Sequence, residues 1–216
     1  MALEAVPITP ELESYLESLL TPRDPVLAGL EREAEEKRVP IVGPQVGTLL
    51  YVLCALLRPN LILELGCATG YSAIWLARGA PNARVVTTEL DPGRAERARR
   101  SFSDAGLSER VEIVEGDALV YMARSDEMFD FVFNDLLNSF ADLETAERAF
   151  ELSLRHLRPG GLLVADNALR RGEVLEPASQ GSRNVVRYNE LVVAEKRLQG
   201  LIVPLRDGVS VARLEP

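Results

Sequence analysis

The chain has 216 residues, of which 47% are apolar and 26% are charged, a composition typical of one globular domain with a substantial core. Its formal charge of −9 disfavours non-specific binding to nucleic acid, although it does not exclude a local basic patch. No apolar run approaches the ~20 residues that a membrane-spanning helix needs, so we expect no contact with a membrane.

The cysteines and the first residues indicate a cellular location. Cys54 and Cys67 are the only cysteines and both lie in apolar segments, so we expect reduced thiols and no disulfide framework. Residues Met1 to Glu11 contain no basic segment followed by an apolar one, so no signal peptide is visible. We therefore expect a cytoplasmic protein.

The first part of the chain is predicted to be helical. Thr9 can cap a helix that begins at Pro10, and residues 31–38 form a mixed-charge run typical of a solvated helix face. Residues 40–44 are predicted to be a loop, and Gln45 to Leu57 a third, apolar helix. We expect one domain, residues 1–216, in which a helical segment precedes an α/β core: residues 1–58 and 59–216.

Two apolar helix faces in this segment are more than one sheet face needs. These faces consist of Leu12, Leu16 and Leu20, and of Leu49, Leu53 and Leu56.

Strand and helix patterns then alternate to the end of the chain. Such alternation predicts a mostly parallel sheet with right-handed crossovers, and Arg206-Asp207-Gly208 between two apolar runs predicts a closing hairpin with one antiparallel strand. The predicted strands are Leu61–Leu65, 84–90, 111–115, 129–134, 162–165, 201–205 and 209–213, and the predicted helices are 73–78, 92–105, 141–157 and 184–198.

A glycine-containing turn follows the first predicted strand. Ligands bind outside the carboxyl ends of such strands, where glycines let them approach the backbone. The position of Tyr71 argues against a dinucleotide fingerprint, which needs a small residue there, and no Gly-Lys-Ser/Thr follows to make a phosphate-binding loop. An ordinary strand-to-helix turn stays an alternative. The spacing Glu64-x-Gly66-x-Ala68-x-Gly70 resembles the first motif of class I methyltransferases that use S-adenosylmethionine (SAM).

Acidic side chains follow the other predicted strands. Glu89 ends the second strand, where a carboxylate can accept hydrogen bonds from both hydroxyls of a ribose, and Asp117 follows the third strand, placed for the adenine end of the same ligand. Asp135 and Asp166-Asn167 end the fourth and fifth strands. Two carboxylates and an amide oxygen suit Mg²⁺, with Mn²⁺ or Ca²⁺ as alternatives. A helix cap at Asp117 and an Asx turn at Asp166-Asn167 are the structural alternatives.

Taken together, these motifs resemble the cation-dependent O-methyltransferases, the family of catechol and caffeoyl-CoA O-methyltransferases, from about Val39 to Arg213. The resemblance implies the Rossmann-like class I fold, a seven-stranded mostly parallel sheet with a C-terminal antiparallel hairpin and N-terminal helices. Because the resembled family is commonly dimeric, we also expect a two-fold homodimer that uses the two apolar helix faces. The residues that carry it are 64–72, Glu89, 116–118, 129–135 and 159–167, with the tail segments 187–189 and 204–208.

The resemblance also implies a site and a reaction. A metal held by Asp135, Asp166 and Asn167 would bind two adjacent oxygens of a small hydroxylated aromatic acceptor and lower the pKa of one hydroxyl, which then attacks the SAM methyl group. The SAM contacts implied by the family and by the motif positions are Val42, Glu64, Gly66, Ala68, Gly70, Tyr71, Ser72, Glu89, Asp117, Ala118 and Asp135.

One departure concerns catalysis. The family strand end reads Asp-Ala-Asp-Lys, with the lysine as general base, whereas here it reads Asp135-Leu136-Leu137-Asn138. An amide takes no proton at any useful pH, so Asn138 stands at the catalytic position without being a base. His156 is the only histidine, and its place at the far end of a helix favours a structural role over that of a substitute base.

The sequence therefore predicts a SAM- and metal-dependent O-methyltransferase of a catechol-like acceptor. Two alternatives stay open. One is a methyltransferase of hydroxylated uridine in tRNA, which the acidic chain disfavours. The other is a SAM-binding protein with weak or no turnover, which Leu137 and Asn138 make credible.

Overall fold

The computed structural model of the chain describes residues 7–216. The first six residues of the Met1–Glu11 segment, on which the signal-peptide expectation partly depends, lie outside the described residues. Within residues 7–216, none of the helices combines the length and the apolar character that crossing a membrane requires.

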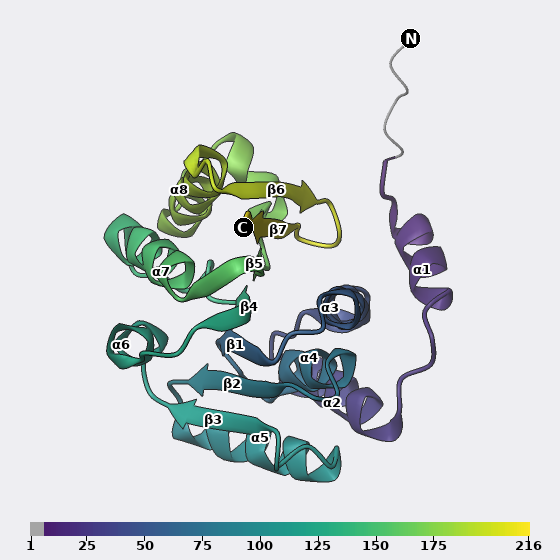
Figure 1. Cartoon of the computed structure of the whole chain (residues 1–216). Coiled ribbons are helices and arrows are strands. Elements are labelled where there is room, and N and C mark those ends of the chain that lie inside the picture. Colours follow the sequence, from purple (N-terminus) through teal and green to yellow (C-terminus); the bar gives the residue numbers. More distant parts are fainter. Residues whose placement is uncertain (1–6) are drawn as a thin grey trace.

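A seven-stranded sheet forms the centre of the molecule, in the order β3-β2-β1-β4-β5-β7-β6 (Figure 1). Only β7 runs antiparallel to its neighbours, β5 and β6, so the predicted sheet with one antiparallel strand is confirmed. Because the chain crosses over between β3 and β4, the carboxyl ends of β1 and β4 meet at the point where the strand order reverses. The strands are β1 (Leu61–Leu65), β2 (Arg84–Glu89), β3 (Val111–Glu115), β4 (Phe129–Asn134), β5 (Leu157–Ala165), β6 (Leu198–Val203) and β7 (Val209–Leu214).

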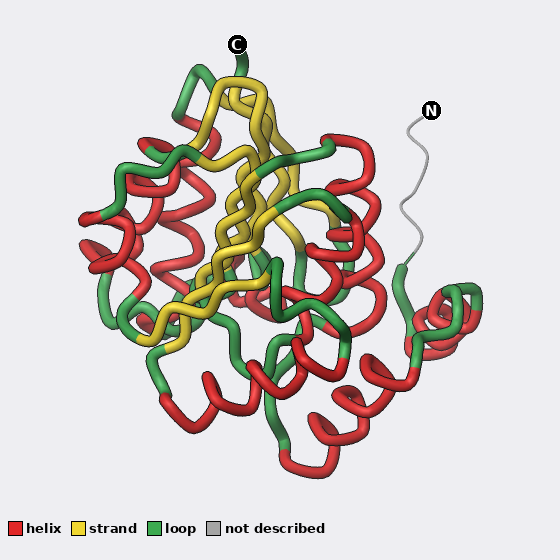
Figure 2. Tube along the Cα trace, turned by 60° about the horizontal axis from the view of Figure 1, so that its bottom comes forward, coloured by secondary structure: helices red, strands yellow, loops and turns green. Residues whose placement is uncertain are grey.

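Helices cover both faces of this sheet, and Figure 2 shows the strands as a twisted band with helices on either side. Parallel strands are buried on both faces, which explains the near-continuous apolar runs of β1 and β4. One core cluster joins the sheet to α3 (Gly43–Leu57), α4 (Tyr71–Gly79) and α5 (Pro92–Asp104). The other joins it to α6 (Ala118–Arg124), α7 (Leu143–Arg155) and α8 (Gln180–Ala194).

The N-terminal helices differ in how they pack. Helix α2 (Pro25–Lys37) buries Leu27, Leu30 and Ala34, whereas α1 (Pro10–Ser18) buries no residue and lies away from the sheet (Figure 1). The predicted cap of α1 is confirmed, because the backbone N–H of Leu12 donates to Thr9 Oγ1 at 3.3 Å. The Pro40–Pro44 loop was predicted too long: α3 already begins at Gly43, with a proline in its first turn, where a missing N–H costs no bond.

The structure corrects several further boundaries. Helix α6 and the 3₁₀ helix η1 (Arg170–Leu175) were not predicted, since each is too short for a periodic pattern. Strand β5 begins at Leu157, five residues before the prediction, because Pro159-Gly160-Gly161 is accommodated by a register shift against β4. Helix α8 begins and ends four residues earlier than predicted, with Ser179 as its cap, and β6 begins where that helix was expected to end.

Candidate functional site

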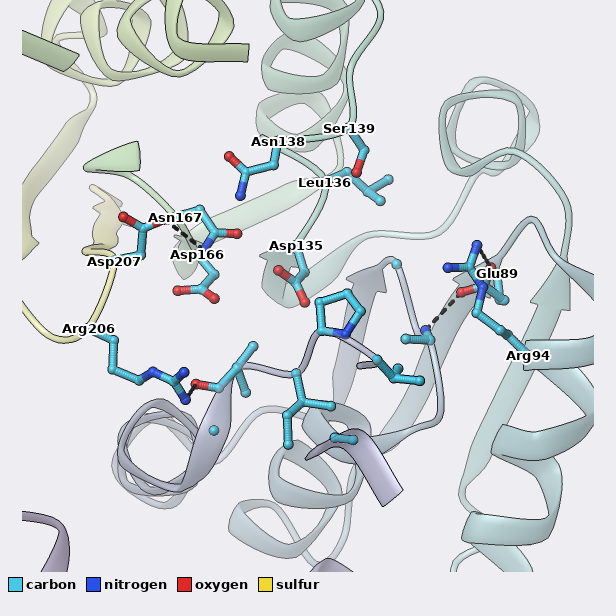
Figure 3. A pocket seen from close by; sticks show the side chains of 18 of the residues that line it. Glu89, Arg94, Asp135, Leu136, Asn138, Ser139, Asp166, Asn167, Arg206 and Asp207 are labelled. Atoms are coloured by element: carbon cyan, nitrogen blue, oxygen red, sulfur yellow. Dashed lines mark hydrogen bonds and ion pairs between the residues drawn. The ribbon is translucent and has the colours of Figure 1, made fainter. Parts of the chain in front are cut away.

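An open cleft of about 1910 Å³ lies at the carboxyl ends of β1, β2, β4 and β5 (Figure 3). At one end, which we call the Glu89 end, it is lined by Gly66, Ala68, Glu89, Asp117 and Ala118. The other end, the Asp166 end, is lined by Asp135, Asn138, Asp166, Asn167, Arg170, Arg206 and Asp207. The predicted residues among these therefore share one cleft.

The turn after β1 has the left-handed backbone that its glycines allow. Gly66 and Gly70 have φ values of 93° and 90°. A Cβ on Gly66 would lie 2.8 Å from Leu136 Cδ2, and one on Gly70 would lie 2.6 Å from the ring of Phe102. Both positions therefore require glycine, because the backbone has a positive φ and a Cβ would collide with a neighbouring side chain. Gly66 lines the cleft, whereas Gly70 lets α4 start against α5.

Glu89 is a nearly buried carboxylate at the edge of the cleft. Its Oε2 accepts a hydrogen bond from the backbone N–H of Ala68 at 2.8 Å, and its Oε1 accepts one from Asp91 at 2.9 Å. Arg94 forms an ion pair with Oε1 at 3.1 Å (Figure 3). Two backbone donors, one of them in the glycine turn, fix this carboxylate in the wall of the cleft.

Asp117, Ala118 and Val42 also line the cleft. Asp117 caps α6 by accepting a hydrogen bond from Val120 N at 2.9 Å, so the structural alternative of a helix cap is correct and coexists with its place at the cleft wall. The carbonyl of Val42 accepts a hydrogen bond from Arg206 Nη1 at 2.9 Å, which ties the start of α3 to the loop between β6 and β7.

Four predicted cofactor residues do not line the cleft: Glu64, Gly70, Tyr71 and Ser72. Glu64 is fully buried beneath it, and burial raises its pKa to about 7, although hydrogen bonds from Ser72 and Thr87 act in the opposite direction. The hydroxyl of Tyr71 donates to Glu31 Oε1 on α2 at 2.7 Å, so this ring ties α4 to α2. Their predicted role toward a cofactor stays a prediction.

The Asp166 end brings three predicted oxygen ligands together. Asp135 and Asp166 follow the adjacent strands β4 and β5, and Asn167 follows directly (Figure 3). Burial and the charge of Asp166 raise the pKa of Asp135 well above its usual value, and burial raises that of Asp166 to about 6. Asp166 Oδ1 is buried without a hydrogen-bond partner among the described residues. Two facing carboxylates and an unpartnered oxygen fit a cation.

Asn167 completes this set as an amide. Within residues 7–216 no three His, Cys, Asp or Glu side chains gather as a metal-binding group, and the third predicted ligand is an amide. Its backbone is left-handed, with φ 62°, which asparagine tolerates better than most residues. Its Nδ2 donates to Asp207 Oδ2 at 3.2 Å. The amide oxygen is thereby left free, as a hard cation requires.

Comparison with known proteins fits this geometry. The sequence pattern of the O-methyltransferase family matches residues 19–214. The chain belongs to the O-methyltransferase family. The catechol O-methyltransferase of Niastella koreensis is 35% identical over 93% of this chain and 95% of its own length. The catechol O-methyltransferase of Mycobacterium tuberculosis is 36% identical over 90% and 88% of the two chains.

Solved structures of O-methyltransferases have the same fold. The Bacillus cereus enzyme, in complex with S-adenosylhomocysteine (SAH), superimposes with a TM-score of 0.83 at 32% identity and covers 95% of this chain and 97% of its own. TomG of Streptomyces achromogenes, involved in tomaymycin synthesis and solved with SAM, gives 0.83 at 30% identity over 95% and 96%. The predicted class I fold of this O-methyltransferase is confirmed.

The two departures from the family motif have different structural settings in this O-methyltransferase. Leu137 is 1% exposed and packs in the core cluster beneath α6, α7 and α8. Asn138 is exposed in the cleft, and its Oδ1 accepts a hydrogen bond from Arg170 Nη1. Leu137 is therefore a core residue, whereas Asn138 is a residue of the cleft.

Other side chains of this O-methyltransferase have the structural roles expected of them. His156 is buried at the end of α7, with Nδ1 2.8 Å from the carbonyl oxygen of Glu127. Cys54 and Cys67 are free and buried, and burial raises the pKa of both thiols. The sequence reasoning missed Arg170 and Asp207 as site residues. Asp207 was noticed only as a hairpin signal, and no local pattern marks Arg170.

Proposed function

We propose that this chain transfers a methyl group from SAM to a hydroxyl of a small catechol-like acceptor, with a divalent cation held by Asp135, Asp166 and Asn167. The observation that carries the proposal is the Asp166 end: a buried carboxylate oxygen without a partner beside a second carboxylate and a free amide oxygen. Such a set is unfavourable without a cation, because two facing carboxylates repel each other.

The Glu89 end supports SAM as the methyl donor. A nearly buried carboxylate that is fixed by backbone N–H groups suits the two hydroxyls of a ribose, and Glu89 is held in this way by Ala68 and Asp91. The B. cereus and S. achromogenes relatives were solved with SAH and SAM. A cofactor that spans from Glu89 toward Asp135 would point its methyl group at the Asp166 end.

A divalent cation held by Asp135, Asp166 and Asn167 would supply positive charge that favours the ionised form of the acceptor hydroxyl. Other residues of the chain orient the predicted ligands. Asp207 turns the amide of Asn167 by accepting from its Nδ2, and the same carboxylate accepts from the backbone N–H of Arg171. Leu136, which lies against Gly66, is an apolar residue that lines the cleft.

The test combines binding and turnover. Calorimetry should detect SAM binding, and methyl transfer to catechols should vanish with EDTA and return with Mg²⁺ or Mn²⁺. Rates should favour acceptors with acidic hydroxyls, because Asn138 cannot take a proton. Methyl transfer that persists in EDTA would refute the role of the cation.

The two alternatives are outcomes of the same experiment. Methyl transfer to tRNA and to no catechol would support the nucleic-acid enzyme, which the charge of −9 disfavours. Binding of SAM and cation without transfer to either substrate would support the binding protein.

We also propose that the chain forms a homodimer through its N-terminal helices. Helix α1 exposes Tyr15 and Leu16, its C-cap residue Leu19 is also exposed, and α3 exposes Leu56 to 77%. Leu49 and Leu53 pack against the core, so the predicted face of α3 is smaller than expected. Exposed apolar side chains on these two helices suit a second copy of the chain. A monomeric mass by light scattering at micromolar concentration would contradict this proposal.

A further inference from the structure

Asn138 stands where the family places its catalytic lysine, and it is held by a specific partner. Arg170 Nη1 donates a hydrogen bond to Asn138 Oδ1 at 2.5 Å. The two residues are 32 positions apart, on the segments that follow β4 and β5. The pair therefore exists only because these strands are neighbours in the sheet.

This bond fixes which way the amide faces. A guanidinium group can only donate, so the amide atom that meets it has to be the oxygen. The amide nitrogen then points the other way, and Figure 3 shows it directed toward Asp135 and Asp166. No residue of the described chain accepts a hydrogen bond from Asn138 Nδ2 within the cleft. Asn138 thus presents an N–H donor to the side of the cleft that carries the predicted cation ligands.

The surroundings of Arg170 show that its position is specified. Its backbone is left-handed, with φ 46°, and its guanidinium lies 3.6 Å from Glu173 Oε2. A Cβ on Gly181 would lie 2.7 Å from Arg170 Nη2, so a glycine at the start of α8 makes room for the side chain. A lysine at position 138 would put an ammonium group against this guanidinium.

We propose that Asn138 donates a hydrogen bond from Nδ2 to the reacting oxygen of the acceptor, and that Arg170 is the positioning residue that holds the amide in this orientation. The inference rests on the proposed function, since it assigns a role within the same site. An N–H donor stabilises an oxyanion relative to the neutral hydroxyl. The residue at the position of the missing base thus donates a hydrogen bond to the ionised oxygen.

The reaction balances without a base at position 138. The hydroxyl proton leaves to water through the open cleft before methyl transfer. The oxygen then forms a bond to the methyl carbon of SAM while the carbon–sulfur bond breaks, and its electron pair stays on sulfur to give SAH. Asn138 holds no proton of the reaction at any stage.

The experiment reads the bound oxyanion directly, with 4-nitrocatechol, whose absorption changes when a hydroxyl ionises. The probe is titrated with pH on the protein saturated with SAH and Mg²⁺. Asn138→Leu should raise the pKa of the bound probe by about one to two units, or ten- to hundred-fold in the ionisation constant, because a hydrogen bond to a charged oxygen is lost. Asn138→Asp keeps the partner of Arg170 but removes the donor, and it should raise that pKa as well.

A double-mutant cycle tests the role of Arg170. If Arg170 acts through the amide, Arg170→Met should raise the probe pKa in the wild type and add little in the Asn138→Leu background. Additive shifts would overturn the positioning role. Arg155→Gln, which removes an exposed arginine at the end of α7, is the matched control and should leave the pKa unchanged. Calorimetry with SAH verifies that each variant is folded.

The outcomes separate this inference from the proposed function. An unchanged probe pKa in both Asn138 variants would overturn the inference even if the protein methylates catechols. A shifted pKa without methyl transfer by the wild type would support the donor role and refute the proposed turnover. Failure of the wild type to bind 4-nitrocatechol would also overturn the inference, while SAM affinity would still test the Glu89 end.

Discussion

At the Glu89 end of the cleft, the carboxylate is fixed by the backbone N–H groups of Ala68 and Asp91, whereas at the Asp166 end the amides of Asn138 and Asn167 are fixed by side chains. Backbone donors persist whatever side chain a position carries. Side-chain partners change with a single substitution. The geometry of the Asp166 end therefore depends more on single side chains than that of the Glu89 end.

The two ends also differ in how their parts reach the cleft. Residues 66–70 and Glu89 belong to strand ends and one tight turn, which a short segment of sequence encodes. The Asp166 end depends on the loop between β6 and β7: Ala168 N donates to the Gly208 carbonyl at 2.9 Å, and Leu169 N to that of Asp207 at 2.8 Å. A Cβ on Gly208 would lie 2.4 Å from Leu169 Cγ, so only glycine allows this approach.

The largest effect should come from removing a carboxylate at the Asp166 end. Asp166→Ala should lower the methyl-transfer rate by ~10³-fold or more, since a cation supplies several kcal/mol of transition-state stabilisation. SAM affinity should change little, because the Glu89 end is untouched. Steady-state kinetics and calorimetry measure the two quantities. Asp126→Asn, at an exposed position, is the control. An equal loss of SAM affinity would show that the ends are not independent.

Restoring the family acid next to Asn138 should damage the fold. Leu137→Asp would put a carboxylate at a position that is 1% exposed, so we expect the free energy of unfolding to fall by about 3 kcal/mol or more. Chemical denaturation measures this loss. Leu143→Asp is the control, because Leu143 is exposed in the first turn of α7, where an acid is favourable. A stable Leu137→Asp variant would place Leu137 in the site rather than the core.

At the Glu89 end we expect a moderate effect on binding alone. Glu89→Ala should weaken SAM binding by ~1–3 kcal/mol, the range for leaving polar groups unpaired. Titration calorimetry gives the affinity, with the exposed Glu109→Ala as control. Unchanged affinity would remove Glu89 from the cofactor site.

The smallest effect concerns α2, which lines the cleft beside the glycine turn. Hydrogen bonds from Arg97 and then Lys37 lower the pKa of Glu33 from 4.5 to about 2. A lowered pKa stabilises the fold above about pH 4.5, and this contribution disappears as the pH falls toward 2. Arg97→Gln should therefore destabilise the protein at pH 7 by less than ~1 kcal/mol, and by less still at pH 3.5. Urea titrations at both values measure it, and a pH-independent difference would contradict this account.

The sequence by itself determined most of the fold and the Glu89 end. Alternating apolar strands and amphipathic helices are compatible with only a few sheet topologies. Gly66 and Gly70 mark the turn after the first strand, and Glu89 marks the carboxylate that lies against this turn. Strand ends of a parallel sheet meet at one edge, so Asp135, Asp166 and Asn167 could be placed together before any contact was seen. Short elements such as α6 and η1 carry too little periodic signal to be predicted.

Only the tertiary structure decided what the departures at 137 and 138 mean. In sequence, both residues simply replace polar family residues. Packing puts Leu137 into the core, and the neighbourhood of β4 and β5 brings Arg170 to Asn138 across 32 residues. The β6–β7 loop likewise brings Asp207 to Asn167. Hydrogen-bond partners that are distant in the chain leave no local pattern, so the orientation of both amides becomes visible only when the strands are assembled.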